Sequence, residues 1–175
     1  MTVPLLLYSL VGLGLFYLQN LAFFPHVRLR LLALLLFYVG LRPSLSLALG
    51  LGIVLGLLQD SYAATPFGLH LGASLLVVAA ARFCRRRFLV QRPVPQMLAS
   101  LVTLLLQEAA LRGGLMVLGF QSFSLDQLIR YHSLEIVATV ALGPALAFLV
   151  LGLEKLLSRW GWRALRDAPL AADLW

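Results

Sequence analysis

The chain has 175 residues, of which 61% belong to the hydrophobic set and only 12% are charged. A soluble domain is typically about 45–50% apolar and about 25% charged. Fourteen basic and seven acidic residues cannot cover the surface of a water-soluble protein of this size, and the mean hydropathy of +0.94 agrees. We therefore exclude a soluble enzyme, a disordered chain and a disulfide-stapled secreted domain, and we expect an all-α integral membrane protein.

Six apolar stretches are predicted to cross the membrane. A helix needs about 20 residues to cross the hydrocarbon, so six spans with short loops occupy residues 1–153 and leave no room for a soluble domain. Residues 154–175 are expected to form a short amphipathic cytoplasmic tail. The expected spans are Val3–Phe24, Leu31–Leu41, Leu45–Leu58, Leu69–Phe83, Gln96–Leu118 and Ser133–Leu153.

Two spans have unusual features. The second is short, because Arg30 and Arg42 bound its uncharged stretch. A helix continued from His26 would lengthen it, with Arg28 and Arg30 reaching outward to the interface. The sixth contains Pro144, which predicts a kink because proline cannot donate a helical hydrogen bond.

The basic residues predict the orientation. If the N-terminus is cytoplasmic, ten of the fourteen bases fall on the cytoplasmic side and three on the outer side, and Arg112 lies within a span. Because cytoplasmic loops carry an excess of arginine and lysine, both termini are expected in the cytoplasm. The same logic assigns the net charge of +7 to topology and anionic lipid, and not to nucleic acid.

The end of the third span carries the first group of candidate residues. Gly52 and Gly56 form a small-xxx-small face that permits close helix packing. Asp60 follows at the start of an outer loop, where it either caps the following turn or helix or belongs to a binding site. Pro66 and Gly68 suit a tight turn into the fourth span.

Glu108 and Arg112 form the second group, one helical turn apart in the fifth span. Ionisable groups inside a membrane are costly, at about 2.5–3.5 kcal/mol each on insertion scales. They are predicted either to neutralise each other on one helix or to anchor a partner helix or polar ligand. Glu-x-x-x-Arg also resembles one motif of prenyl-protein-processing membrane proteases. That family has a second glutamate where Gln107 stands here, and its histidine motifs are absent, so we expect no catalytic site, metal or cofactor.

Taken together, these motifs resemble the MreD family of rod shape-determining proteins. The strongest segment is G-L-L-Q-D-S-Y-A-A-T-P-F-G-L-H, from Gly56 to His70. It is similar to that family's Gly-x-x-x-Asp, short polar loop and Pro-hydrophobic-Gly signature. A proline, leucine-rich helix, tyrosine and proline succession within Pro25–Pro43, and Pro144 with its basic exit at Lys155, agree with the same pattern.

The resemblance implies a non-catalytic multi-pass protein of the bacterial inner membrane that acts in cell shape and lateral peptidoglycan synthesis. It implies an MreC-like bitopic partner, a RodA-type glycosyltransferase with its transpeptidase, and an MreB-like filament. It also implies a six-helix bundle resembling the S-component fold of energy-coupling-factor transporters. That kinship supplies the alternative function, a subunit that binds a vitamin-like small molecule, because fold alone does not determine function.

Overall fold

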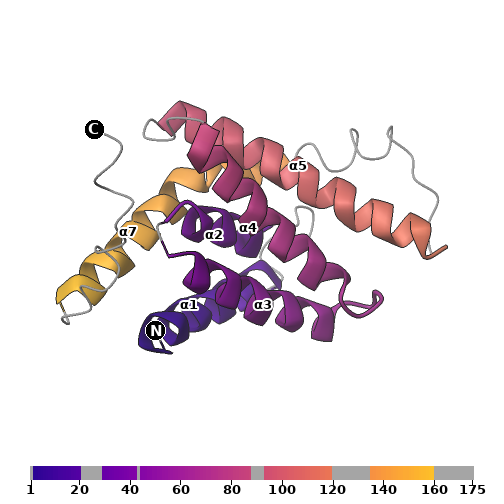
Figure 1. Cartoon of the computed structure of the whole chain (residues 1–175), viewed down its shortest axis with the longest axis horizontal. Helices are drawn as coiled ribbons and strands as arrows, with labels where there is room; N and C mark the ends of the chain where they lie inside the picture. The colour runs from indigo at the N-terminus through magenta and orange to yellow at the C-terminus, as the bar shows by residue number, and fades with distance from the viewer. Residues whose placement is uncertain (1, 21–28, 43, 88–92, 120–134, 160–175) are drawn as a thin grey trace.

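The computed structural model describes residues 2–20, 29–42, 44–87, 93–119 and 135–159, and within these ranges it contains helices and turns but no strand (Figure 1). All six expected spans have a helix within the described residues, although the ends differ. The helices are α1 (Thr2–Asn20), α2 (Leu31–Gly40), α3 (Leu45–Tyr62), α4 (Leu69–Arg87), α5 (Pro93–Val117), a short helix Glu135–Ala141 and α7 (Gly143–Arg159).

Successive helices run back and forth along the long axis of the molecule. In Figure 1 the start of α1, the end of α4, the start of α5 and the end of α7 lie toward the left, whereas α3 and α5 end toward the right. The helix ends therefore lie at two opposite ends of the bundle, and the described side chains at these two ends carry different charges.

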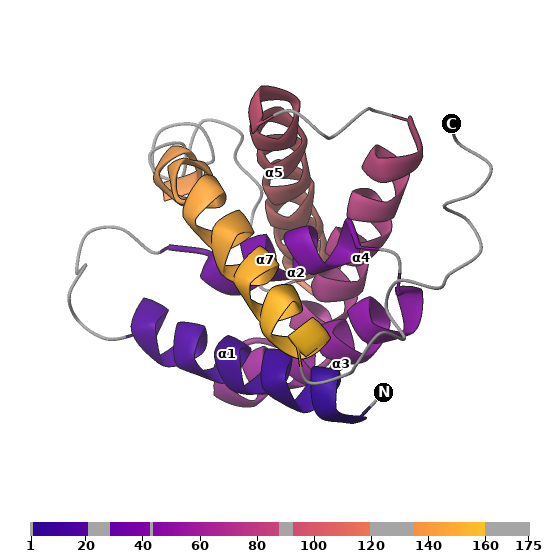
Figure 2. The same ribbon diagram turned by 90° about the vertical axis from the view of Figure 1, so that its left-hand side faces the viewer.

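Helix α2 lies at the centre of the bundle (Figure 2). All ten of its residues are buried, and it packs against α1, α3, α4, α5 and α7. Ten helical residues rise about 15 Å, which is roughly half of the hydrocarbon thickness. The helix expected as a short second span is thus hidden behind its neighbours.

The expected extension of this helix from His26 is wrong. Helix α2 begins at Leu31, and Arg30 has a non-helical backbone with φ −101° and ψ 56°. The backbone N–H of Arg30 donates to the Thr139 hydroxyl at 3.2 Å. A hydrogen bond to a distant helix therefore takes the place of a further turn at this end.

Helix α3 packs along α4 through its glycine face. A Cβ placed on Gly56 would lie 2.7 Å from Cα of Leu71, and one placed on Gly52 would lie 3.4 Å from Cγ2 of Val78. The backbones of α3 and α4 approach closely at Gly56 because no side chain separates them. Helix α3 ends at Tyr62 and not at Leu58, so Asp60 lies in its last turn and not in a loop.

The kink expected at Pro144 is confirmed. Glu135–Ala141 and Gly143–Ser158 meet at an angle of 43°. Pro144 stands in the first turn of α7, where it has no N–H to donate to the carbonyl of Val140, so the helical hydrogen bonding breaks at this point.

By length and composition, three described helices are apolar and long enough to cross a membrane: Val3–Asn20, Leu45–Tyr62 and Val94–Val117. The bent pair would be a fourth. Helix α2 is too short to count alone, and the last turns of α4 carry arginines. The described chain is therefore a helical protein with three to four candidate spans, and six spans stay a prediction.

We predict that Gly56→Ala destabilises the bundle, whereas Gly72→Ala does not. The new methyl group at Gly56 would press on the α4 backbone, and overpacking costs about 1–3 kcal/mol. Gly72 is exposed on α4 with open space around it, so alanine there should be neutral or stabilising by up to about 1 kcal/mol through helix propensity. Thermal unfolding of the purified protein in detergent measures both, and equal midpoints would show that α3 and α4 do not meet so closely.

Candidate functional site

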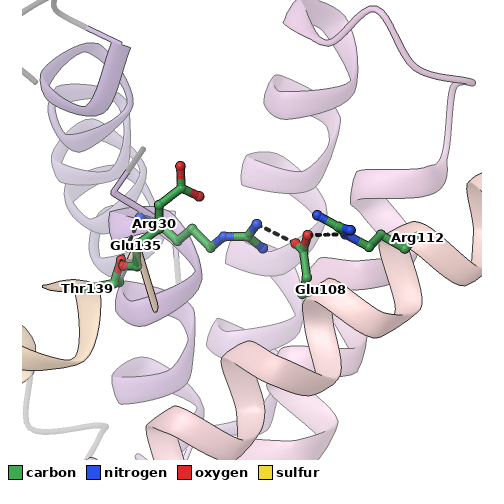
Figure 3. Close-up of polar contacts among 5 residues, drawn as sticks. All are labelled: Arg30, Glu108, Arg112, Glu135 and Thr139. Carbon is green, nitrogen blue, oxygen red and sulfur yellow. Dashed lines mark hydrogen bonds and ion pairs between the residues drawn. The ribbon is translucent and has the colours of Figure 1, made fainter. Parts of the chain in front are cut away.

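Glu108 is the centre of a buried ionic cluster. The Nε of Arg112 donates to its Oε1 at 2.6 Å, one turn along α5, as the sequence spacing predicts. The Nη2 of Arg30 forms an ion pair with its Oε2 from the start of α2 (Figure 3). The Glu108 side chain is 6% exposed, against 19% for Arg30 and 18% for Arg112. One carboxylate thus joins two guanidinium groups inside the bundle.

The position of Arg30 corrects the expectation that it reaches outward. Because α2 is short and buried, Arg30 lies against the inside of the bundle, where a carboxylate is its available partner. A charge in such surroundings is stable only when it is paired and hydrogen-bonded. Arg28, which was expected to reach outward with it, lies outside the described residues.

The same cluster joins a third helix. Thr139 accepts a hydrogen bond from the Arg30 backbone and donates its hydroxyl to the carbonyl of Glu135 at 2.6 Å. Glu135 is 9% exposed and lies one turn before Thr139. The short helix is thereby joined to the start of α2, next to the Arg30–Glu108 ion pair.

A second ion pair holds the opposite end of α2. The Nε of Arg42 lies 3.1 Å from Oε1 of Glu154 on α7, and the two side chains are 30% and 29% exposed. Sequence reasoning missed this pair and the Arg30–Glu108 pair. The available signal was the uncharged stretch between Arg30 and Arg42, which is too short to bring both arginines to water.

Asp60 is bound by the backbone of the following helix. Its Oδ2 accepts hydrogen bonds from the N–H groups of Gly68 at 2.9 Å and Leu71 at 3.1 Å, and its Oδ1 accepts one from His70 at 2.9 Å. The first N–H groups of a helix have no partner within the helix, and the helix dipole favours an anion there. Asp60 is 4% exposed, so it caps α4 from inside the bundle.

The turn that makes this contact possible depends on Pro66 and Gly68. Gly68 adopts φ +95°, in the left-handed region that favours glycine. The carbonyl of Pro66 accepts a hydrogen bond from the N–H of Leu69 at 3.3 Å. The segment from Gly56 to His70 is therefore a compact connection whose distinctive residues fix how α4 leaves α3.

The structure divides the candidate residues into two groups. The first group lies along α3 and its connection to α4, and consists of Gly52, Gly56, Asp60, Pro66 and Gly68. The second group, Glu108 with Arg112, lies on α5 beside Arg30.

Within the described residues, no three histidine, cysteine, aspartate or glutamate side chains are grouped so that they could hold a metal ion.

These features define a class of protein. Long apolar helices surround a short buried one, and the charges at the ends of that helix are paired within the bundle. Such an arrangement belongs to a helical multi-pass membrane protein.

A family assignment follows from comparison with known proteins. The model of the rod shape-determining protein MreD family matches residues 2–158. The chain therefore belongs to the MreD family, which acts in determining cell shape. Neither the curated proteins nor the solved structures give a significant match.

We predict that Glu108→Gln is far more damaging than Glu154→Gln. The first leaves Arg30 and Arg112 without their shared carboxylate inside the bundle, and breaking a buried ion pair costs about 3–5 kcal/mol. The second breaks a pair that is partly exposed, and such a pair contributes about 0–1 kcal/mol. Thermal unfolding midpoints in detergent give the comparison.

A second variant separates pairing from simple loss of packing. Adding Arg30→Gln to Glu108→Gln removes one of the stranded charges, so the double variant should unfold at a higher temperature than Glu108→Gln alone. An equal loss of stability in Glu108→Gln and Glu154→Gln would contradict this prediction. A double variant that is less stable than Glu108→Gln would also contradict it. Either result would show that the cluster does not hold the helices together.

Proposed function

We propose that the chain is a non-catalytic integral membrane scaffold of the bacterial rod-elongation complex. It acts in cell shape and lateral peptidoglycan synthesis by binding an MreC-like bitopic partner. The observation that carries this proposal is the family match, which extends over residues 2–158 and so includes nearly all of the described helices.

The use of the acidic residues supports a scaffold over an enzyme. Of the four described acids, Asp60 caps α4, Glu108 joins Arg30 to Arg112, and Glu154 pairs with Arg42. Each of these carboxylates already has partners that hold two or more helices in place. These carboxylates stabilise the bundle itself, which suits a protein that positions other proteins.

The outer faces of the bundle support binding of a partner's membrane helix. Helices α1, α5 and α7 carry rows of exposed apolar side chains, which pack equally well against lipid or another apolar helix. The Gly52–Gly56 face is occupied by α4, so among the candidate residues the α3–α4 connection is the better partner contact. A RodA-type glycosyltransferase with its transpeptidase and an MreB-like filament complete the proposed assembly.

We also propose six spans, resembling an S-component arrangement, in the inner membrane with both termini in the cytoplasm. The distribution of charge supports this orientation. Where α2, α4 and α7 end, the described side chains include several bases and one acid, whereas the opposite end has two bases and three acids. The first set is Arg42, Arg82, Arg85, Arg86, Lys155 and Glu154; the second is Arg30, Arg112, Asp60, Glu108 and Glu135.

The direct test is co-purification. The chain, with green fluorescent protein at its C-terminus, is expressed with the MreC-like protein of the same organism and purified from membranes. We expect the partner to be recovered at a fixed ratio, and the tag to fluoresce because it folds in the cytoplasm. An unrelated bitopic protein is the control. Recovery no better than that control would overturn the partner, and a dark tag on an intact chain would reverse the orientation.

Asp60→Ala tests the α3–α4 connection as the contact. Loss of the carboxylate leaves three N–H groups at the start of α4 without a partner, so we expect looser geometry there and reduced recovery of the MreC-like protein. Ser61→Ala is the control, because Ser61 is exposed and donates to the carbonyl of Leu57 in its own helix. If Asp60→Ala lowers the unfolding temperature but leaves recovery unchanged, Asp60 is only a helix cap.

A further inference from the structure

The last turns of α4 carry the strongest concentration of charge in the described chain. Arg82, Arg85 and Arg86, here called the α4 arginine cluster, lie within a turn and a half of the end of the helix. Arg85 and Arg86 are exposed and Arg82 is half-buried. No acidic residue occurs in the sequence between Asp60 and Glu108, so the exposed Arg85 and Arg86 have no acid near them along the chain.

Helical geometry places these side chains together. At about 100° per residue, Arg82 lies between Arg85 and Arg86, and the three occupy an arc of about 100°. Phe83 follows beside Arg86 on the same side of the helix and is 60% exposed. Three guanidinium groups and one exposed aromatic ring thus share one surface at the end of an apolar helix.

The described neighbours of the two exposed arginines, Arg85 and Arg86, add no negative charge. Helix α4 packs against α2, α3 and α5, and the described parts of those helices bring no acid to this end of the bundle. The described acid at this end is Glu154 on α7, which pairs with Arg42. Lys155, on the next position of α7, is exposed at the same end of the bundle but on a different helix.

We propose that the α4 arginine cluster binds the phosphate of an anionic phospholipid headgroup. Guanidinium groups donate paired hydrogen bonds that match phosphate oxygens. A lipid also supplies an acyl chain that can pack on Phe83, which free phosphate does not. The site is independent of the proposed MreC-like partner.

The test measures lipid binding to the full chain. Protein purified in dodecyl maltoside and stripped of lipid is titrated with tetraoleoyl cardiolipin, dioleoyl phosphatidylglycerol, dioleoyl phosphatidylcholine or inorganic phosphate. Native mass spectrometry counts the lipid molecules retained. We expect cardiolipin, with two phosphates, to bind more tightly than phosphatidylglycerol, and both to bind more tightly than phosphatidylcholine. Binding of the anionic lipids should weaken as salt is raised.

Variants localise the site. Each basic residue near an anionic headgroup strengthens binding about fivefold, so Arg85→Gln or Arg86→Gln should weaken phosphatidylglycerol binding by about that factor, and the double variant by about 25-fold. Lys155→Gln removes one charge at the same end of the bundle but away from α4, and should leave binding unchanged. Arg85→Lys with Arg86→Lys keeps the charge and supports the proposal if it retains most of the affinity.

Several outcomes would overturn the proposal. One is equal binding of phosphatidylcholine and the anionic lipids. Another is a loss on Lys155→Gln as large as that on Arg86→Gln, which would indicate general surface charge. Inorganic phosphate that blocks lipid binding at equal concentration would indicate a phosphate site without a lipid. If the double glutamine variant does not fold, the proposal is tested by lipid binding of the two single glutamine variants and of the double lysine variant.

Discussion

Helix α2 is ten residues long and buried on every side, and the other helices are arranged around that constraint. A helix of about 15 Å cannot reach both surfaces of a hydrocarbon layer of about 30 Å. Its flanking arginines therefore face protein where they would otherwise face hydrocarbon. Arg30 meets Glu108 on α5, and Arg42 meets Glu154 on α7, so each end of α2 is tied to another helix. Five helices enclose the remainder, which explains why a bundle this small has a fully buried centre.

The same constraint explains how a chain with few acids uses them. An unpaired charge in low dielectric costs far more than a pair, so each acid placed in the bundle must meet a base or several N–H donors. Glu108 serves two arginines, and Asp60 serves three backbone N–H groups at the start of α4. These contacts connect α2 to α5 and α3 to α4. Acidic side chains thus supply the polar contacts that join these pairs of otherwise apolar helices.

The bundle has two chemically different ends. One end is rich in arginine and the other holds three of the four described acids. A member of the MreD family acts in determining cell shape. The described charges inside the bundle are paired, and its outer faces carry exposed apolar side chains, which suits the proposed role as a membrane scaffold. The α3–α4 connection lies at the end opposite the arginines of α4.

The sequence by itself determined the solvent, the helical class and the family. The apolar composition indicates a protein surrounded by lipid, and the positions of Pro and Gly mark where helices are connected. The Gly56–His70 motif is contiguous in the sequence, so it can be recognised without the structure. The sequence also determined the Glu108–Arg112 pair, because residues four apart on a helix are neighbours. Only the tertiary structure decided that Arg30 turns inward, that Arg42 finds Glu154, and that α2 is buried. These contacts join residues more than seventy positions apart, and local periodicity carries no information about which helices pack together.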